Sequence, residues 1–245
     1  MPEIKLKVEL IRNTLQPEEL VAMGAKLCYT NMDLNSLQDK ISTSDQSAFI
    51  QKLNALGHNS VQEHASFTFA ISGISRVCLA QLTRHRIASF SVQSQRYVSF
   101  GDGFNFIIPP KIAALGDDAK QEYIDQMNTM HKWYKQWQDK LGKGEQGNED
   151  ARFVLPGACE TRLILTMNVR ELKHFLSLRM CNRAQWEIRA LATEMFKIAL
   201  NIAPVLFENA GAACLRGVCP EGGMSCGLAN EIREERKQLL LNLKK

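Results

Sequence analysis

The chain opens with a strand pattern and then changes its hydrophobic period several times, which limits the folds open to it. Ile4, Leu6, Val8 and Leu10 alternate with charged residues, the two-residue period of a half-buried strand. Residues 65–72 and 161–167 are also predicted to be strands, and helical patterns separate them. Because the order shows no regular βαβ alternation, the sequence predicts an α+β fold, with helices around a mostly antiparallel sheet and no parallel doubly wound sheet.

Helices are predicted where start and stop residues flank an apolar period. They begin at Pro17 and Asn168, and they cover residues 44–56, 75–83, 117–140, 184–202 and 228–245. Gly57 is expected to end the helix over residues 44–56. The glycine-rich residues 142–148 are expected to form a flexible connection. With no internal repeat, residues 1–245 are predicted to form a single domain, whose tail from about residue 212 has no assigned role.

The composition favours an ordinary folded protein. Hydrophobic residues make up 45% of the chain and charged residues 23%, which argues against disorder. No segment has the roughly 18 to 20 apolar residues of a membrane span, and the first ten residues lack the core of a signal peptide. The seven scattered cysteines are expected to be reduced thiols, so a cytoplasmic protein without membrane partners is predicted.

One segment concentrates the positive charge. From His64 to Gly101 there is no Asp, Glu or Lys, yet the segment holds Arg76, Arg84, Arg86 and Arg96. Arginine without acidic neighbours indicates bidentate contact with phosphate or carboxylate. We therefore expect a donor-rich surface, empty of competing carboxylates, that binds an anionic ligand.

The triplet Arg84-His85-Arg86 lies at the exit of a predicted helix. A run of hydroxyls and amides follows it, namely Ser89, Ser91, Gln93, Ser94 and Gln95. Such donors suit a phosphate and the polar edge of a heterocycle. The alternative is a basic helix end whose arginines cap backbone carbonyls.

A second cluster lies on the helix that begins at Asn168. Arg170 and His174 share one face, and Arg179 falls at the border of the apolar stripe, near the helix end. A partly buried Arg179 has either a ligand as its partner or the carbonyls of the helix C-terminus. Arg152 is open to the same two interpretations.

Other kinds of site find little support. His58 and His64 lack further ligands at tight spacing, and Cys214, Cys219 and Cys226 have no histidine nearby, so no metal site is expected. No Walker segment or complete Gly-x-Gly-x-x-Gly motif exists, which argues against a P-loop or Rossmann nucleotide site.

These residues together resemble a known family. Arg84-His85-Arg86, then seven residues, then Ser94 and Arg96-Tyr97 is similar to the signature motif of the flavin-dependent thymidylate synthases. Further matches occur between about residues 57 and 189 in the order expected. They are Gly57-His58, Ser60, Glu63-His64, Gln81, Arg152 before Val154-Leu155-Pro156, Asn168-Val169-Arg170, His174, Arg179 and Ala184-Gln185-Trp186-Glu187-Ile188.

The resemblance implies an enzyme that methylates dUMP to dTMP with FAD, methylenetetrahydrofolate and NADPH, as a homotetramer with shared active sites and the α+β fold of that family. It implies flavin contacts at Ser60, Arg84, His85, Arg86, Val92, Asn168, Arg170 and His174. It implies dUMP contacts at Gln81, Arg84, Gln93, Ser94, Gln95, Arg96, Arg152 and Arg179, the last polarising the uracil ring. Val92 and Arg183 depart from the side chains of several relatives, so a contact at Val92 must use its backbone.

Two rival functions are considered. Residues 84–100, with interleaved Phe90, Tyr97 and Phe100, are compatible with a single-stranded RNA-binding module, but the balanced charge elsewhere argues against nucleic acid as a partner. A methylase with a cysteine nucleophile would have to use Cys181, the cysteine that follows Arg179 most closely. We expect no side-chain nucleophile, because Ser94 has no base beside it in sequence.

Overall fold

The computed structural model describes residues 3–243 and falls into two compact units. Unit 1 comprises Met1–Glu9, Ala70–Arg86 and Phe90–Leu165. Unit 2 comprises Leu10–Phe69, Ile87–Ser89 and Thr166–Lys245. The chain passes between the units several times, which is why no single position in the sequence marks a boundary.

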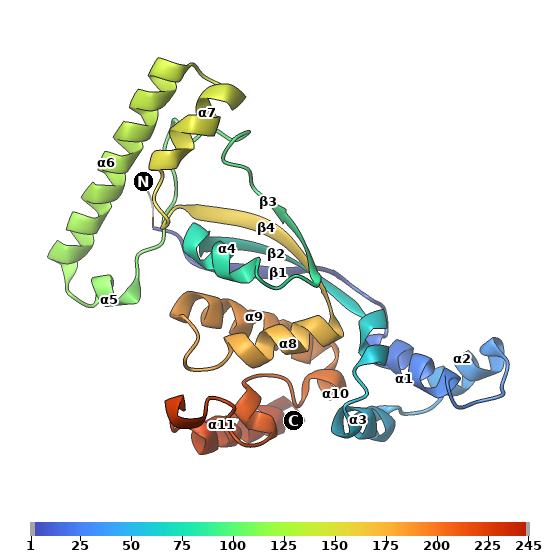
Figure 1. Ribbon diagram of the computed structural model, residues 1–245. Helices are drawn as coiled ribbons and strands as arrows, with labels where there is room; N and C mark the ends of the chain where they lie inside the picture. The colour runs from blue at the N-terminus through green and yellow to red at the C-terminus, as the bar shows by residue number, and fades with distance from the viewer. Residues whose placement is uncertain (1–2, 244–245) are drawn as a thin grey trace. The chain divides into compact units, whose positions relative to one another are not determined.

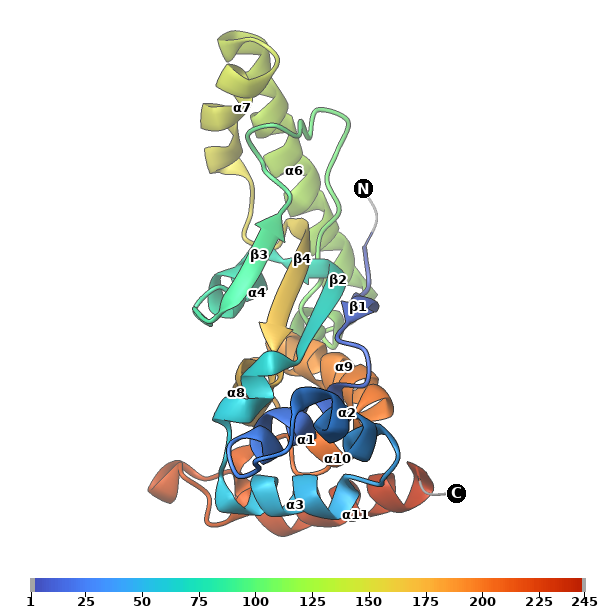
Figure 2. The ribbon, with the colours of Figure 1, turned by 90° about the vertical axis from the view of Figure 1, so that its right-hand side faces the viewer.

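One antiparallel sheet of four strands provides the β-structure. Its order is β1 (Lys7–Asn13), β2 (Ser66–Ser75), β4 (Glu160–Asn168), β3 (Ala88–Val92), as Figure 2 shows. Along β2, Phe67, Phe69 and Ile71 are buried and alternate with less buried residues, as the two-residue period requires. The predicted α+β class is confirmed, although β1 starts three residues later than the alternation suggested.

Unit 1 adds helices to its part of the chain. They are α4 (Arg76–Leu82), α5 (Pro110–Ala113), α6 (Asp117–Leu141), α7 (Glu145–Ala151) and the 3-10 turn η2 (Arg152–Val154). As predicted, Ser75 caps α4, because its side chain accepts a hydrogen bond from the backbone N–H of Cys78. Figure 1 shows α6 and α7 side by side. Their core is Phe100, Phe104, Phe106, Ile108, Met127, Tyr134, Ala151 and Cys159.

The expected flexible connection over residues 142–148 is wrong, since α7 begins inside it. Gly147 cannot carry a side chain, because a Cβ there would lie 1.7 Å from the carbonyl oxygen of Gly142. Asn148 is buried, accepts hydrogen bonds from Tyr134 Oη and Gln138 Nε2, and donates one to the carbonyl of Arg96. Tertiary contacts therefore order a segment whose composition is typical of a loop.

Unit 2 is built mainly from helices. They are α1 (Pro17–Leu27), α2 (Leu34–Ser42), α3 (Ser47–Leu56), α8 (Val169–Arg179), α9 (Trp186–Ile202), α10 (Pro204–Phe207) and α11 (Ala229–Leu243), with 3-10 turns η1 (Ser60–His64), η3 (Ala213–Arg216) and η4 (Gly222–Met224). Gly57 ends α3 in the left-handed conformation with φ of 72°, as predicted. The sequence prediction missed α2, which Asp33 caps through the backbone N–H groups of Asn35 and Ser36.

The apolar stripe of α8 forms part of the unit 2 core. Leu172, Phe175 and Leu176 are fully buried, and α8 packs against α9. The last predicted helix is α11, and its expected final residues 244–245 lie outside the described residues. Among residues 3–243, no helix is both long and apolar enough to cross a bilayer.

Candidate functional site

The Arg84-His85-Arg86 triplet directly follows α4 and alternates between outward and inward side chains. Arg84 and Arg86 are exposed, whereas His85 is buried and its backbone N–H donates to the carbonyl of Leu82. Within residues 3–243, neither guanidinium makes a hydrogen bond or ion pair, so the carbonyl-capping alternative gains no support for these two arginines. Gln81, in the last turn of α4, is half-buried. Two unpaired guanidinium groups therefore face solvent at this end of α4.

The polar run that follows begins at the end of β3, where Val92 is the last strand residue. The backbone N–H of Gln93 donates to the carbonyl of Arg162, and its own carbonyl accepts from Arg76 Nη2 at 2.7 Å. Arg76 is partly buried, and its Nε has no hydrogen-bond partner among the described residues. Its pKa is lowered by burial and, to a lesser degree, by the charge of Arg152. Arg76 and Arg152 therefore belong to one positively charged region of unit 1.

Ser94 and Gln95 have structural partners of their own. Ser94 Oγ accepts hydrogen bonds from the backbone N–H groups of Arg96 and Tyr97, a turn-forming role that does not activate the hydroxyl. Gln95 Nε2 donates to Cys159 Sγ at 3.7 Å. Burial raises the pKa of the Cys159 thiol to about 11, so it is protonated at neutral pH.

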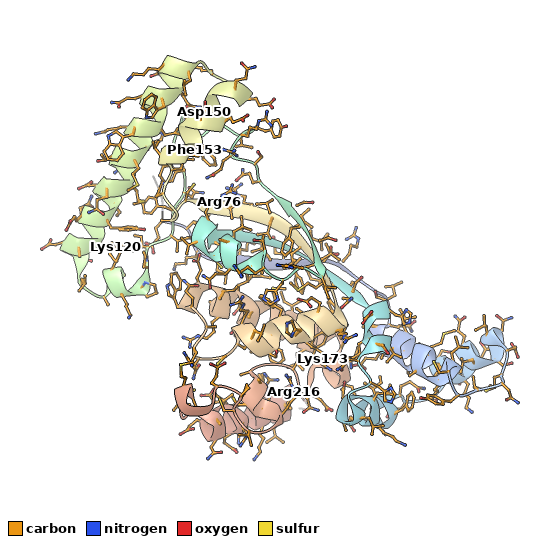
Figure 3. The ribbon with its side chains drawn as sticks, in the orientation of Figure 1. Arg76, Lys120, Asp150, Phe153, Lys173 and Arg216 are labelled. Atoms are coloured by element: carbon orange, nitrogen blue, oxygen red, sulfur yellow. The ribbon has the colours of Figure 1, made fainter. Side chains whose placement is uncertain are left out.

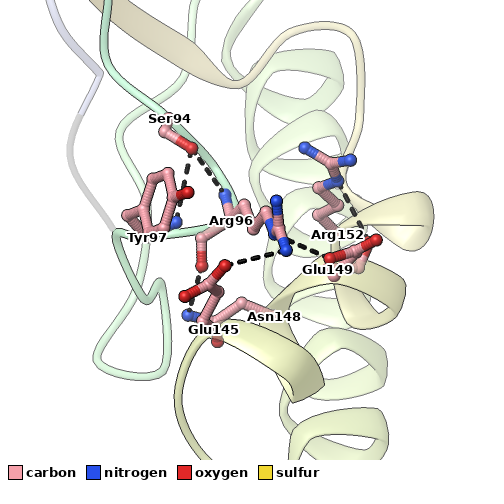
Figure 4. A network of polar contacts seen from close by, with 7 residues as sticks. All are labelled: Ser94, Arg96, Tyr97, Glu145, Asn148, Glu149 and Arg152. Atoms are coloured by element: carbon pink, nitrogen blue, oxygen red, sulfur yellow. Dashed lines mark hydrogen bonds and ion pairs between the residues drawn. The ribbon is translucent and has the colours of Figure 1, made fainter.

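Arg96 lies between two carboxylates of α7, as Figure 4 shows. Its Nη2 is 2.8 Å from Glu145 Oε1, and its Nε is 2.6 Å from Glu149 Oε2, an ion-pair contact without hydrogen-bond geometry. The expectation of a surface empty of competing carboxylates is therefore wrong at this arginine. No Asp or Glu occurs in the thirty residues that precede Arg96, but folding brings α7 against it.

Arg152 joins the same network (Figure 4). Its Nε donates to the backbone carbonyl of Glu149 at 3.0 Å, in the last turn of α7. The capping alternative thus describes this nitrogen of Arg152, while its two terminal nitrogens have no hydrogen bond among residues 3–243. Arg96 contacts the carboxylate of Glu149 and Arg152 contacts its backbone carbonyl, so two guanidinium groups, the kind of donor that binds phosphate, converge on one residue of α7.

The second cluster occupies a hollow of about 700 Å³ in unit 2, which Asn168, Arg170 and His174 line together. Asn168 caps α8, since its Oδ1 accepts from the backbone N–H of Glu171 at 2.8 Å, as the sequence predicted. Arg170 Nη1 pairs with Glu63 Oε1 at 2.5 Å, and His174 is exposed. The capping bond leaves the amide nitrogen of Asn168 for a ligand.

Gln62 also lines this hollow and bears on whether it holds a cofactor. Its side chain is 1% exposed, yet its Oε1 has no hydrogen-bond partner among the described residues. Buried acceptors are nearly always paired, so a donor from a bound group fits here. The cationic and amide donors around it suit the phosphates and hydroxyls of a flavin dinucleotide.

Ser60 does not line the same hollow as Asn168, Arg170 and His174. It is exposed at the start of η1 and lines a different hollow of about 710 Å³, between residues of α1, α2, α3 and η1. The structure therefore does not bring this predicted flavin contact into the α8 cluster.

Arg179 is the last residue of α8 and is half-buried, as its place at the edge of the apolar stripe predicted. It lines a hollow of about 310 Å³ with four cysteines, Cys181, Cys214, Cys219 and Cys226. Burial, followed by the neighbouring thiol of Cys219, raises the pKa of Cys214. No group of three or more potential ligands in the described part of the chain is arranged to hold a metal ion.

The predicted site residues thus form two sets, one in each unit. Gln81, Arg84, His85, Arg86, Val92, Gln93, Ser94, Gln95, Arg96 and Arg152 belong to unit 1, and Ser60, Asn168, Arg170, His174 and Arg179 belong to unit 2. Sequence reasoning missed the glutamates of α7, the buried Gln62 and the half-buried Lys173. The available signal for a helix there was Glu145, an acidic residue that suits the first turn of a helix.

Comparisons with known proteins decide the family. The sequence profile described as "Thymidylate synthase complementing protein" matches residues 9–205. The chain is 50% identical to the flavin-dependent thymidylate synthase of Geobacter sulfurreducens over 229 residues, which cover 93% of this chain and 97% of the relative. This chain belongs to the flavin-dependent thymidylate synthase family.

Other family members agree over nearly the full length. The flavin-dependent thymidylate synthase of Clostridium tetani is 43% identical over 94% of this chain and 96% of its own. That of Pyrococcus abyssi is 38% identical over 96% of this chain and 98% of its own. The predicted class, a flavoprotein thymidylate synthase, is confirmed, and the alternative of an RNA-binding module has no support.

Proposed function

We propose that this chain converts dUMP to dTMP, with FAD as cofactor, 5,10-methylenetetrahydrofolate as carbon donor and NADPH as reductant. The proposal is supported by membership of the flavin-dependent thymidylate synthase family and by the guanidinium and amide donors of both units, which include the residues that resemble the family's motif. When bound, the flavin supplies the two-electron chemistry that lets a methylene group be delivered as methyl. The residues of the chain bind and orient the ligands, and they polarise the uracil ring.

The dUMP phosphate is assigned to the arginines of unit 1. A phosphate dianion needs several charge-assisted donors, and Arg84, Arg96 and Arg152 supply planar guanidinium groups for it. Gln81, Gln93, Ser94 and Gln95 are assigned to the nucleoside by the family motif. Arg179, which is fixed at the end of α8, is assigned to the uracil ring, where a partly buried charge polarises the ring more strongly than one in water.

The flavin is assigned to the α8 hollow of unit 2 and to the Arg84-His85-Arg86 triplet. Asn168, Arg170 and His174 line the hollow, and the buried acceptor of Gln62 supports a ligand there. Ser60 and the backbone of Val92 complete the assignment by family motif alone. No side chain is assigned as a nucleophile, because the Ser94 hydroxyl is occupied by backbone N–H groups.

The proposal includes a homotetramer with shared active sites, in which each chain forms a single domain with the fold specific to the family. It also includes a cytoplasmic location. Subunit sharing can be tested by mixing two inactive variants, Arg84→Ala and Arg179→Ala. If a site takes these residues from different subunits, some mixed tetramers contain intact sites and activity returns. If each subunit holds a complete site, the mixture stays inactive.

The activity itself is tested with purified, FAD-loaded protein. We expect a yellow protein that forms dTMP when dUMP, methylenetetrahydrofolate and NADPH are all present, with product identified by mass spectrometry. Omitting any one of the three should abolish product. A colourless protein that binds no FAD, or dTMP formation without FAD, would contradict the proposal.

A further inference from the structure

The α8 hollow contains a second group of polar side chains, to which the resemblance assigned no role. Lys173, labelled in Figure 3, lies on α8 and lines this hollow together with Asn54 of α3 and Gln62 of η1. All three residues belong to unit 2. They come from three separate elements, so only folding brings them together.

Hydrogen bonds hold these three side chains in a fixed arrangement. Asn54 Nδ2 donates to the carbonyl of Val205 at 3.0 Å, which sets the orientation of the amide. Asn54 Oδ1 then accepts from Lys173 Nζ at 2.9 Å and from Gln62 Nε2 at 3.1 Å. The arrangement leaves two N–H groups on Lys173 and the orphaned Oε1 of Gln62.

The charge around Lys173 is not neutralised at close range. Within residues 3–243 its ammonium forms no ion pair, and Glu208 acts on it only at longer range. Burial, together with the positive charge of Arg216, lowers the pKa of Lys173 to about 8. The other charged groups that line the hollow are Glu63, Arg170, Glu171 and His174, and Glu63 is already paired with Arg170.

A partly buried cation without a counter-ion and a buried acceptor without a donor are both unfavourable in the ligand-free protein. One ligand relieves both if it carries an anionic oxygen and a hydroxyl or N–H group. Arg216, also labelled in Figure 3 and exposed on η3, adds a second positive charge to the same hollow. Phosphate attached to a polyhydroxylated carbon chain or ribose has this chemistry.

We propose that Lys173 and Gln62 form a ligand subsite in the α8 hollow, in which Lys173 binds a phosphate oxygen and Gln62 Oε1 accepts a hydrogen bond from an adjacent hydroxyl. The inference rests on the proposed function, since FAD is the ligand assigned to this hollow. It adds two binding residues to that site. The contribution of Lys173 to affinity then depends on the phosphate of the ligand and not on its isoalloxazine ring.

The test compares wild type with Lys173→Gln, whose amide can still donate to Asn54. FAD and riboflavin are titrated into the flavin-free protein, and dUMP into the FAD-loaded protein. Loss of one charge-assisted hydrogen bond should weaken FAD binding about tenfold or more. Riboflavin, which has no phosphate, should bind the two proteins alike. Lys197→Gln serves as control, because Lys197 lies exposed on α9 in an ion pair with Glu194.

The pH dependence of FAD affinity gives a second test. In wild type, FAD affinity should fall as the pH rises through about 8, because Lys173 loses its proton there. Lys173→Gln should lack this fall. Gln62→Met, which has no acceptor oxygen, should weaken both FAD and riboflavin, since the ribityl hydroxyls are common to both.

Each outcome has a distinct meaning. If wild type binds no FAD, the proposed function fails. If wild type binds FAD and Lys173→Gln binds it equally well at every pH, the subsite is refuted while the proposed function stands. If Lys173→Gln weakens dUMP and leaves FAD unchanged, the phosphate belongs to the substrate and the assignment to FAD is overturned. Thermal melting of each variant without ligand reports whether the fold is intact.

Discussion

The carboxylates around Arg96 lead to the prediction that replacing them increases the affinity for substrate. Glu145 and Glu149 hold the guanidinium of Arg96 at 2.8 and 2.6 Å. If Arg96 binds the phosphate of dUMP, these carboxylates compete with it for the same N–H groups. Replacing both glutamates with glutamine removes the negative charges while keeping the size of the side chains.

The magnitude follows from exposure. The side chains of Arg96, Glu145 and Glu149 are 41%, 43% and 45% exposed, so each ion pair is of the solvent-screened kind worth about 0.2 to 1 kcal/mol. Two such pairs oppose phosphate binding by up to roughly 2 kcal/mol, which corresponds to a gain in dUMP affinity of at most about 30-fold. The effect should shrink as the salt concentration rises.

The assay is calorimetric titration of dUMP and of deoxyuridine into FAD-loaded protein. The double variant Glu145→Gln/Glu149→Gln should bind dUMP more tightly and deoxyuridine as the wild type does. Glu122→Gln is the matched control, because Glu122 is an exposed glutamate of α6 whose carboxylate contacts Gln126. Weaker dUMP binding in the double variant would mean that the glutamates position Arg96, and an equal change for deoxyuridine would mean that the fold has shifted. Either result refutes the competition argument.

Three further predictions concern turnover and stability. Arg179→Ala should lower kcat/KM by roughly 30- to 1000-fold, or about 2 to 4 kcal/mol, while the visible spectrum still shows bound FAD. Arg179→Lys should recover little activity, because a point charge lacks the planar fork of a guanidinium. Near-normal turnover of Arg179→Ala would mean that Arg179 only ends the helix. Cys181→Ala should keep its turnover in the dTMP assay, and an inactive but folded and flavin-loaded variant would revive the cysteine-nucleophile mechanism. Asn148→Ala should lower the free energy of unfolding by about 2 to 4 kcal/mol in urea titrations, because it strips partners from Tyr134, Gln138 and the carbonyl of Arg96; a loss below 1 kcal/mol, on the scale of a surface site, would contradict this.

Local patterns were sufficient where one element carries its own signals. The cap of α8 at Asn168, the cap of α4 at Ser75 and the stop of α3 at Gly57 all occur where the sequence predicted them, since each depends on residues within one turn. The half-buried position of Arg179 likewise follows from helical periodicity alone. The helix α2 was missed even though its signals are local, since Asp33 is a standard cap and Leu34, Leu37 and Ile41 recur at helical spacing.

The sequence by itself thus determined the α+β class, most of the helices, the ordered motif residues and, through them, the family. Tertiary structure alone decided which charges meet. The segment around Arg96 contains no acid, yet α7, some fifty residues later, provides two. Lys173, Asn54 and Gln62 are unremarkable in sequence, but they share hydrogen bonds inside one hollow. Electrostatic interactions depend on distance in space and on burial, and neither can be read from spacing along the chain.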